Sequence, residues 1–353
     1  MMHSVIRPQF SRARSGPAKA PPVAAGEWVQ VASAQEIAAS LDKDGKLDGV
    51  PFMPEMLRFC GQRLRVHRRA EKTCVEGHGL RRMEGTVLLQ GARCDGAGHD
   101  GCQRGCMIFW KEAWLQPVDG GAALNEPDPI EEADARLGLA SAPTRDGDRY
   151  LCQSTALAQA TGPLSKWSFG LIAGDVRRGE LSIAGFLDIV WRTLANLARR
   201  KLGLPELGVF AGAGSKGPAA TLGLKPGEWV KVRPVDQIEA TLGPNGKHRG
   251  LSFEPEMGRY IGGTYRVGQP VERIILEETG KMVDLRNTVT LETLTCQGSC
   301  VKNCPRANPL FWREAWLERA DPPRMPSAAP GRRPTAGPRG SAPAPAWPSP
   351  NPA

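Results

Sequence analysis

The feature that most constrains this chain is an internal duplication. At a fixed offset of 201, residues 26–66 match residues 227–267 at 19 of 41 positions without a gap. One residue is then inserted in the second copy, and at an offset of 202 the segment 109–115 (FWKEAWL) aligns with 311–317 (FWREAWL). Self-similarity at a fixed period indicates repeated structural units. We therefore expect one domain, built twice, over residues 26–118 and 227–319.

Local patterns within each copy predict a mainly β unit with a short helix. Residues 28–31 alternate apolar and polar side chains, as a half-buried strand does. Ser33 and Glu36 form a capping-box pattern, which predicts a helix directly after that strand. Further strands are expected at 63–66 and 86–89, and residues 110–115 are expected to close the sheet.

The opening Gly-x-x-Val-x-Val pattern, followed by a long loop with a helix and by short strands, resembles an SH3-like barrel. Residues 54–61 and 255–262 resemble part of the SH3-like domain of nitrile hydratase β subunits. The whole pattern is similar to uncharacterised bacterial tandem-repeat proteins with the motif FW[KR]EAWL in each repeat. These resemblances imply a mainly β fold with α elements: two tandem SH3-like small barrels joined by a helical linker region. They imply no activity.

Three segments lie outside the copies. Residues 1–25 are predicted to be a disordered basic arm, and residues 320–353 a disordered tail with 11 prolines. Residues 119–226 are predicted to be a linker that contains an amphipathic helix at 181–201, because its apolar residues recur at helical spacing. We expect this helix to dock on the barrels. The alternative is a helix that binds a partner or a membrane surface.

The charge distribution argues against a nucleic-acid-binding surface. The formal charge is +9, but seven of these charges lie in the two terminal segments, and each copy is within one charge of neutral. Phosphate binding needs clustered Lys and Arg on a folded face. The sequence has no apolar stretch of the roughly 20 residues that span a bilayer, and its first residues do not resemble a secretory signal. We expect a cytoplasmic protein.

The cysteines predict a metal site. Cys94 and Cys102 align with Cys296 and Cys304, and each copy adds a third cysteine to the same loop, Cys106 or Cys300. In a reducing compartment, clustered cysteines more often bind metal than form disulfides. Thiolates suit either zinc or an iron–sulfur cluster, and the spacing does not decide between them.

A fourth ligand is needed for each loop if the two loops form separate sites. His99 lies within the first loop, whereas Val301 occupies the matching place in the second. Cys152, outside both copies, is therefore assigned to the second loop; a single site shared by both loops is the alternative. The predicted metal ligands are Cys94, His99, Cys102, Cys106, Cys152, Cys296, Cys300 and Cys304. No catalytic residue is assigned.

The remaining repeated residues are predicted to be structural. Cys60 and Cys74 face Ile261 and Ile275 in the other copy, which indicates buried apolar positions. Glu55 and its counterpart Glu256 are expected to pin a loop.

Three functions are compatible with these patterns. The first is a metal-binding scaffold, with zinc or an iron–sulfur cluster, that presents surfaces to a protein partner. The second is a redox or maturation enzyme or accessory with an iron–sulfur or thiolate centre. The third is nucleic-acid binding through the basic tails. The sequence leaves open whether the chain is an enzyme, and its oligomeric state.

Overall fold

The computed structural model describes residues 22–118, 127–165, 168–213, 221–298 and 302–323. The first copy contains, in order, β1 (Trp28–Val31), α1 (Ala34–Ser40), β2 (Lys46–Leu47), β3 (Val50–Pro51), η1 (Pro54–Phe59), β4 (Arg63–Arg69), β5 (Lys72–Val75), β6 (Gly79–Arg82), β7 (Thr86–Arg93), β8 (Met107–Lys111), η2 (Glu112–Trp114) and β9 (Leu115–Pro117).

The second copy repeats this order closely. It contains β13 (Trp229–Val232), α6 (Val235–Glu239), β14 (Lys247–His248), β15 (Leu251–Ser252), η3 (Pro255–Tyr260), β16 (Thr264–Pro270), β17 (Arg273–Ile275), β18 (Met282–Asp284), β19 (Thr288–Thr295), β20 (Pro309–Arg313), η5 (Glu314–Trp316) and β21 (Leu317–Arg319).

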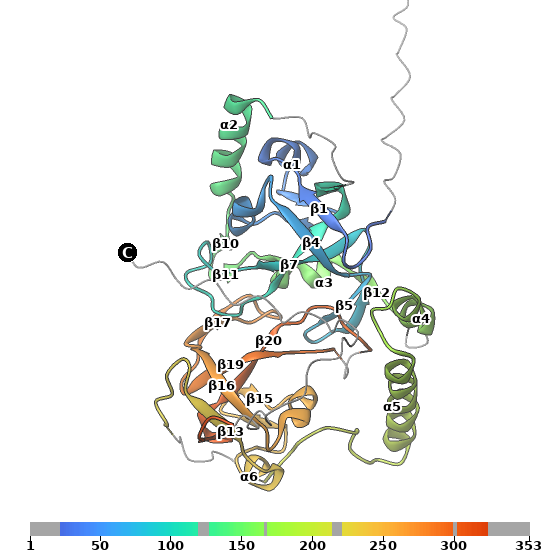
Figure 1. Ribbon diagram of the computed structural model, residues 1–353, viewed down its shortest axis with the longest axis vertical. Coiled ribbons are helices and arrows are strands. Elements are labelled where there is room, and N and C mark those ends of the chain that lie inside the picture. Colours follow the sequence, from blue (N-terminus) through green and yellow to red (C-terminus); the bar gives the residue numbers. More distant parts are fainter. Residues whose placement is uncertain (1–21, 119–126, 166–167, 214–220, 299–301, 324–353) are drawn as a thin grey trace, which may run out of the picture.

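The protein is mainly β with some helices, and it has two separate five-stranded antiparallel sheets (Figure 1). Their strand orders are β8-β7-β4-β1-β9 and β20-β19-β16-β13-β21, which are the same order in the two copies. Even the registers correspond, since Trp28 pairs with Arg65 in the first sheet and Trp229 pairs with Arg266 in the second. The duplication in sequence is therefore a duplication in structure.

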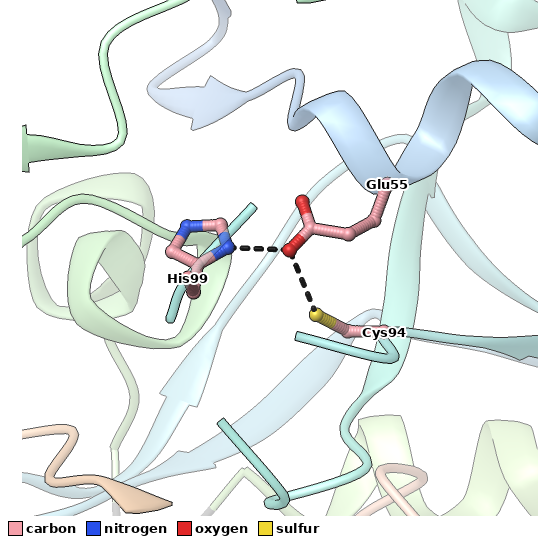
Figure 2. Close-up of side chains that lie close together, drawn as sticks. All are labelled: Glu55, Cys94 and His99. Atoms are coloured by element: carbon pink, nitrogen blue, oxygen red, sulfur yellow. Dashed lines mark hydrogen bonds and ion pairs between the residues drawn. The ribbon is translucent and has the colours of Figure 1, made fainter. Parts of the chain in front are cut away.

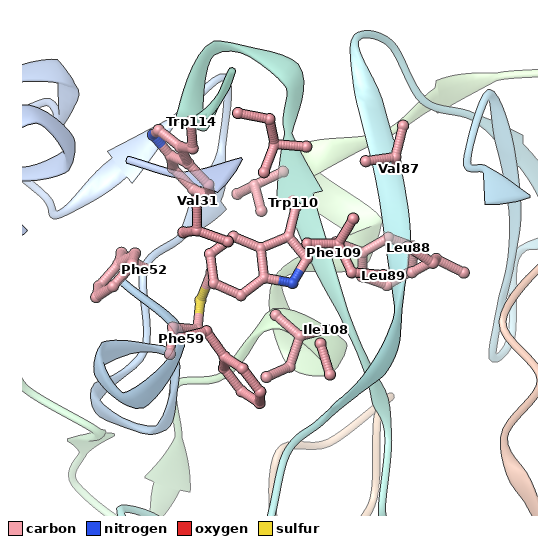
Figure 3. Packing of buried hydrophobic residues seen from close by; sticks show 14 of the residues in the cluster. Val31, Phe52, Phe59, Val87, Leu88, Leu89, Ile108, Phe109, Trp110 and Trp114 are labelled. Carbon is pink, nitrogen blue, oxygen red and sulfur yellow. The ribbon is translucent and has the colours of Figure 1, made fainter. Parts of the chain in front are cut away.

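Tryptophans from the repeated FWxEAWL segment fill each core. In the first copy, Trp110 and Trp114 are fully buried among aliphatic and aromatic side chains (Figure 3). Phe52 packs edge-on against Trp114, with ring centroids 5.9 Å apart. The indole N–H of Trp114 donates to Ser40 Oγ at 2.9 Å, which satisfies its one polar atom at the edge of the core.

The second core uses the matching residues. Phe253 packs edge-on against Trp316 at 5.1 Å, and Trp316 donates to Thr241 Oγ1 at 3.0 Å. Each copy thus has its own hydrophobic core, built from the same positions.

The segment between the copies contains more structure than a linker with one helix. It forms α2 (Pro129–Ala140), β10 (Arg145–Asp146), β11 (Arg149–Tyr150), α3 (Gln153–Ala160), β12 (Gly162–Pro163), α4 (Phe169–Arg177) and α5 (Ile183–Lys201). Glu132 in α2 accepts a hydrogen bond from the Gln35 N–H, so α2 packs beside α1. Acidic residues and a proline at its start favour a helix, which the sequence interpretation of 119–149 as linker overlooked.

Helix α5 covers the segment where the sequence predicts an amphipathic helix, but it lies at the side of the molecule next to α4 (Figure 1). On the predicted apolar face Ile189 is buried, Phe186 and Val190 are half-buried, and Leu194 and Leu197 are 47% and 37% exposed. Beside that face, Ile183, Leu187 and Trp191 are 59–70% exposed. None of the described helices has the length and hydropathy needed to cross a membrane.

Candidate metal centre

Three side chains of the first copy converge from three places in the chain. Glu55 lies in the 3-10 helix η1, Cys94 directly follows β7, and His99 lies in the cysteine loop between β7 and β8. Figure 2 shows the three side chains pointing toward one another. Their ligand atoms all lie within 4.8 Å of one another, so this group could hold a metal ion.

One distance within the group matches a coordination sphere, and one is too short for it. Glu55 Oε1 lies 2.5 Å from His99 Nδ1 and 3.7 Å from Cys94 Sγ. Around tetrahedral zinc, oxygen and sulfur ligands are about 3.6 Å apart, and oxygen and nitrogen ligands about 3.4 Å. Thus the sulfur is already at a suitable distance from the carboxylate. The imidazole must move by about 1 Å to exchange its hydrogen bond for a metal bond.

The second nitrogen of His99 fixes the orientation of the ring. Nε2 lies 3.0 Å from the carbonyl oxygen of Leu151, which can only accept a hydrogen bond, so Nε2 carries a proton. A metal-binding histidine commonly donates its other ring N–H to a backbone carbonyl in this way. Nδ1 is therefore the nitrogen that faces the group.

Glu55 carries an unsatisfied oxygen atom. The residue is 6% exposed, and its Oε2 atom has no hydrogen-bond partner among the described residues. A buried carboxylate oxygen without a partner is costly unless a cation or a donor satisfies it. The donor set of oxygen, nitrogen and sulfur is one that zinc accepts.

Opposed effects set the protonation of Glu55 and His99. Burial raises the pKa of Glu55, but the hydrogen bond from His99, its charge and backbone N–H groups together outweigh burial and hold the pKa below its usual value. For His99, burial lowers the pKa, and the hydrogen bond and charge of Glu55, together with Leu151 and Asp100, more than reverse this. Both shifts favour the charged forms, a carboxylate beside an imidazolium. Metal binding at Nδ1 requires the loss of its proton.

A small cavity lies next to this group. It has a volume of about 30 Å³, and its lining includes His99 and four cysteines: Cys94, Cys102, Cys106 and Cys152. Burial raises the pKa of Cys94, Cys102 and Cys152, for the last to about 11. Uncharged thiols therefore surround a space large enough for one ion or one to two waters. A bound cation would stabilise their thiolate forms.

Cys152 lies beside the cysteines of the first copy. It is the N-cap of α3, and α3 is held on the first copy through Gln153, whose side chain bonds both the N–H and the C=O of Phe109 in β8. Cys152 lines one cavity with Cys94, Cys102 and Cys106. The sequence does not reveal where α3 docks, so it did not indicate this neighbourhood.

The remaining predicted ligands belong to the second loop. Cys296 directly follows β19 and is partly buried, and Cys304 is 2% exposed. Cys300 lies outside the described residues. Val301, which stands in place of His99, lies there as well. Glu256, the counterpart of Glu55, is buried and pairs with Arg259 at 3.1 Å. The acidic side chain of the second copy thus has a cation partner on its own 3-10 helix.

Two residues of these sites were interpreted as structural from the sequence. Glu55 was expected to pin a loop, and its buried place beside Cys94 gives it a further role. Cys74 was expected to fill a core, but its backbone N–H donates to Cys304 Sγ at 3.2 Å. The only feature of the sequence that bears on Cys74 is that Ile275 occupies its position in the second copy, so the two copies differ there. Cys60 does lie in the hydrophobic core.

Comparisons with known proteins add no relative: no family model, no curated protein and no solved structure matches this chain.

Proposed function

We propose that the chain is a zinc-binding scaffold protein whose first copy holds the ion through Glu55, Cys94 and His99, with a cysteine of the adjoining cavity as fourth ligand. The observation that carries the proposal is the convergence of these three buried side chains with an unsatisfied carboxylate oxygen. Cys106 and Cys152 line the same cavity as Cys94 and His99, so either is a candidate for the fourth ligand.

The mixed ligand set favours a single ion. Clusters are held by thiolates, whereas zinc also accepts carboxylate and imidazole.

The role of the ion in this proposal is structural. It would join η1, the cysteine loop and, through Cys152, the start of α3, adding to the hydrogen bonds that Gln153 and Glu55 already make between these segments. The strand order supports two SH3-like barrels as the units that are joined. The exposed apolar side chains of α5 support a protein partner, since a soluble protein seldom leaves such a row uncovered.

An iron–sulfur centre with redox or maturation chemistry is the second candidate. Its support is the presence of four cysteines, Cys94, Cys102, Cys106 and Cys152, around one cavity. Four thiolates are the usual ligand set of such clusters.

Metal analysis of the full chain, purified without oxygen, tests the proposal. We expect zinc without iron or acid-labile sulfide, and a loss of about one zinc per chain in Glu55→Gln and Cys94→Ser. Glu256→Gln and Cys60→Ser are the matched controls, since Glu256 pairs with Arg259 and Cys60 lies in the core. Iron and sulfide in equal amounts, lost in Cys94→Ser, would support the second candidate. Unchanged metal content in both site variants would refute a centre at this place.

A further inference from the structure

The described parts of the two cysteine loops, which exclude residues 299–301, share several backbone features. Four positions with positive φ recur at matching places: Gly96 and Gly298, Asp100 and Lys302, Gly101 and Asn303, and Gly105 and Ala307. Gly96 packs directly on the backbone of Cys102, and Gly298 packs in the same way on Cys304. Cys296 and Cys304 are therefore presented by their loop as Cys94 and Cys102 are presented by theirs.

Each loop is contacted by the other copy. The N–H of Ile275, in β17, donates to Cys102 Sγ at 3.4 Å, and the N–H of Cys74, in β5, donates to Cys304 Sγ at 3.2 Å. Ile275 and Cys74 are the same position in the two copies. The contact is thus reciprocal, as in an isologous dimer interface.

Matching arginines complete the reciprocal contact. Arg104 donates to the carbonyl oxygen of Ile275 at 2.8 Å, and Arg306 donates to that of Cys74 at 3.0 Å. Arg306 is 5% exposed, and Glu277 lies 2.7 Å from it. The two copies are therefore held in one arrangement by buried and charge-assisted bonds, not by loose contact.

The two reciprocal contacts differ in one side chain. At the first loop the other copy contributes the apolar side chain of Ile275, and Cys152 adds a thiol from the segment between the copies. At the second loop the other copy contributes a thiol directly, because Cys74 is hydrogen-bonded to Cys304. Each loop therefore has a cysteine from outside its own copy.

We propose that the junction between the copies is a second metal centre, in which Cys74 of the first copy joins Cys296 and Cys304 of the second to bind a thiophilic ion such as zinc. The inference rests on the proposed function in that both centres use the same type of loop. Its donors are sulfur atoms, without a carboxylate or imidazole. The three sulfur atoms do not all lie within 4.8 Å of one another, so loading would draw Cys296 toward the Cys74–Cys304 pair and would lock the two copies together.

Zinc stoichiometry of the full chain tests this inference. The reduced protein is loaded with Zn(II) without oxygen, freed of excess ion and measured for bound zinc. We expect two zinc ions per chain in the original sequence and one in Cys74→Ile. Isoleucine is the side chain that the second copy has at this position, so the variant should keep its fold, which circular dichroism checks. Cys60→Ala, which removes a core cysteine, should keep both ions.

The two proposals fail in different ways. Loss of the first centre alone, in Glu55→Gln, should leave the zinc ion that depends on Cys74. A chain that binds one zinc, lost in Glu55→Gln but kept in Cys74→Ile, would overturn the second centre and leave the first. One zinc lost only in Cys74→Ile would do the opposite. A Cys74–Cys304 disulfide in the protein as isolated, with zinc binding unaffected by Cys74→Ile, would also overturn the inference.

Discussion

Nδ1 of His99 lies 2.5 Å from Oε1 of Glu55, and the two side chains are each 1% exposed. A buried pair of this kind gains little over an apolar pair of the same volume, but removal of one partner leaves an uncompensated charge. The second oxygen of Glu55 has no partner among the described residues. The pair is therefore poorly explained by stability alone, and with Cys94 it forms a group that could hold a metal ion.

Substitution of His99 alone should be more harmful than substitution of both residues. In metal-free protein, His99→Leu leaves the Glu55 carboxylate buried without its partner, at a cost of about 3 kcal/mol. Glu55→Gln combined with His99→Leu removes the charge and should recover at least about 1 kcal/mol. Urea unfolding with a chelator present measures both values. Losses that simply add would show that the two side chains do not interact.

Gly96 should tolerate no side chain. It has φ +73°, and a Cβ atom there would overlap the backbone of Cys102. Gly101 also has φ +73°, but no atom lies within 4 Å of its Cβ position. Gly101→Ala should therefore cost about 1 kcal/mol through backbone strain, whereas Gly96→Ala adds a clash that displaces Cys102. Chemical unfolding and zinc content compare the two variants. Equal effects would mean that the close approach at Gly96 is unimportant.

Asp175 connects three parts of the chain. This residue of α4 is 2% exposed, and it accepts hydrogen bonds from Lys72 of the first copy and Asn303 of the second. Asp175→Ala would leave the ammonium group of Lys72, itself 3% exposed, without its charge partner. We expect a loss of about 3–5 kcal/mol. Asp188→Ala is the control, because Asp188 forms a half-exposed pair with Arg192 and should cost less than about 1 kcal/mol. A small loss in Asp175→Ala would mean that water replaces the pair.

The duplication and the local patterns predict much of the fold. The alternation at residues 28–31 predicts β1, and Ser33 with Glu36 does form the capping box at the start of α1. These features depend on neighbouring residues, so a sequence displays them. The tryptophans of the two FWxEAWL segments likewise occupy the two cores, whereas Trp28, in the repeated first strand, is 56% exposed.

The candidate site was less predictable because it depends on how segments dock. The loop cysteines could be identified by comparing the copies, and His99 by its place among them. The position of Cys152 depends on Gln153 bonding the backbone of β8, which no local pattern encodes. The role of Cys74 depends on the reciprocal packing of the copies. Because Ile275 occupies this position in the second copy, Cys74 was interpreted as a core residue. The two residues instead lie at matching places in the contact between the copies, where the side chains differ.

His67 should make stability depend on pH. It lies in β4, partly buried; burial, followed by the charges of Arg68 and Arg93, lowers its pKa to about 4. In the unfolded chain its pKa is about 6.5. Between these values the unfolded state binds a proton that the folded state does not. The free energy of unfolding therefore keeps its full contribution from His67 above pH 6.5 and loses it progressively as the pH falls toward 4.

Replacement of His67 by Gln should remove this dependence. We expect the original chain to lose about 2–3 kcal/mol more than His67→Gln between pH 7 and pH 4, because glutamine does not titrate. His78, exposed beyond β5, provides the matched control: His78→Gln should leave the pH dependence close to that of the original chain. Urea unfolding across this range, with a chelator present to remove metal effects, measures the difference. Parallel curves for the original chain and His67→Gln would mean that His67 is protonated equally in the folded and unfolded states, and that its burial carries no such penalty.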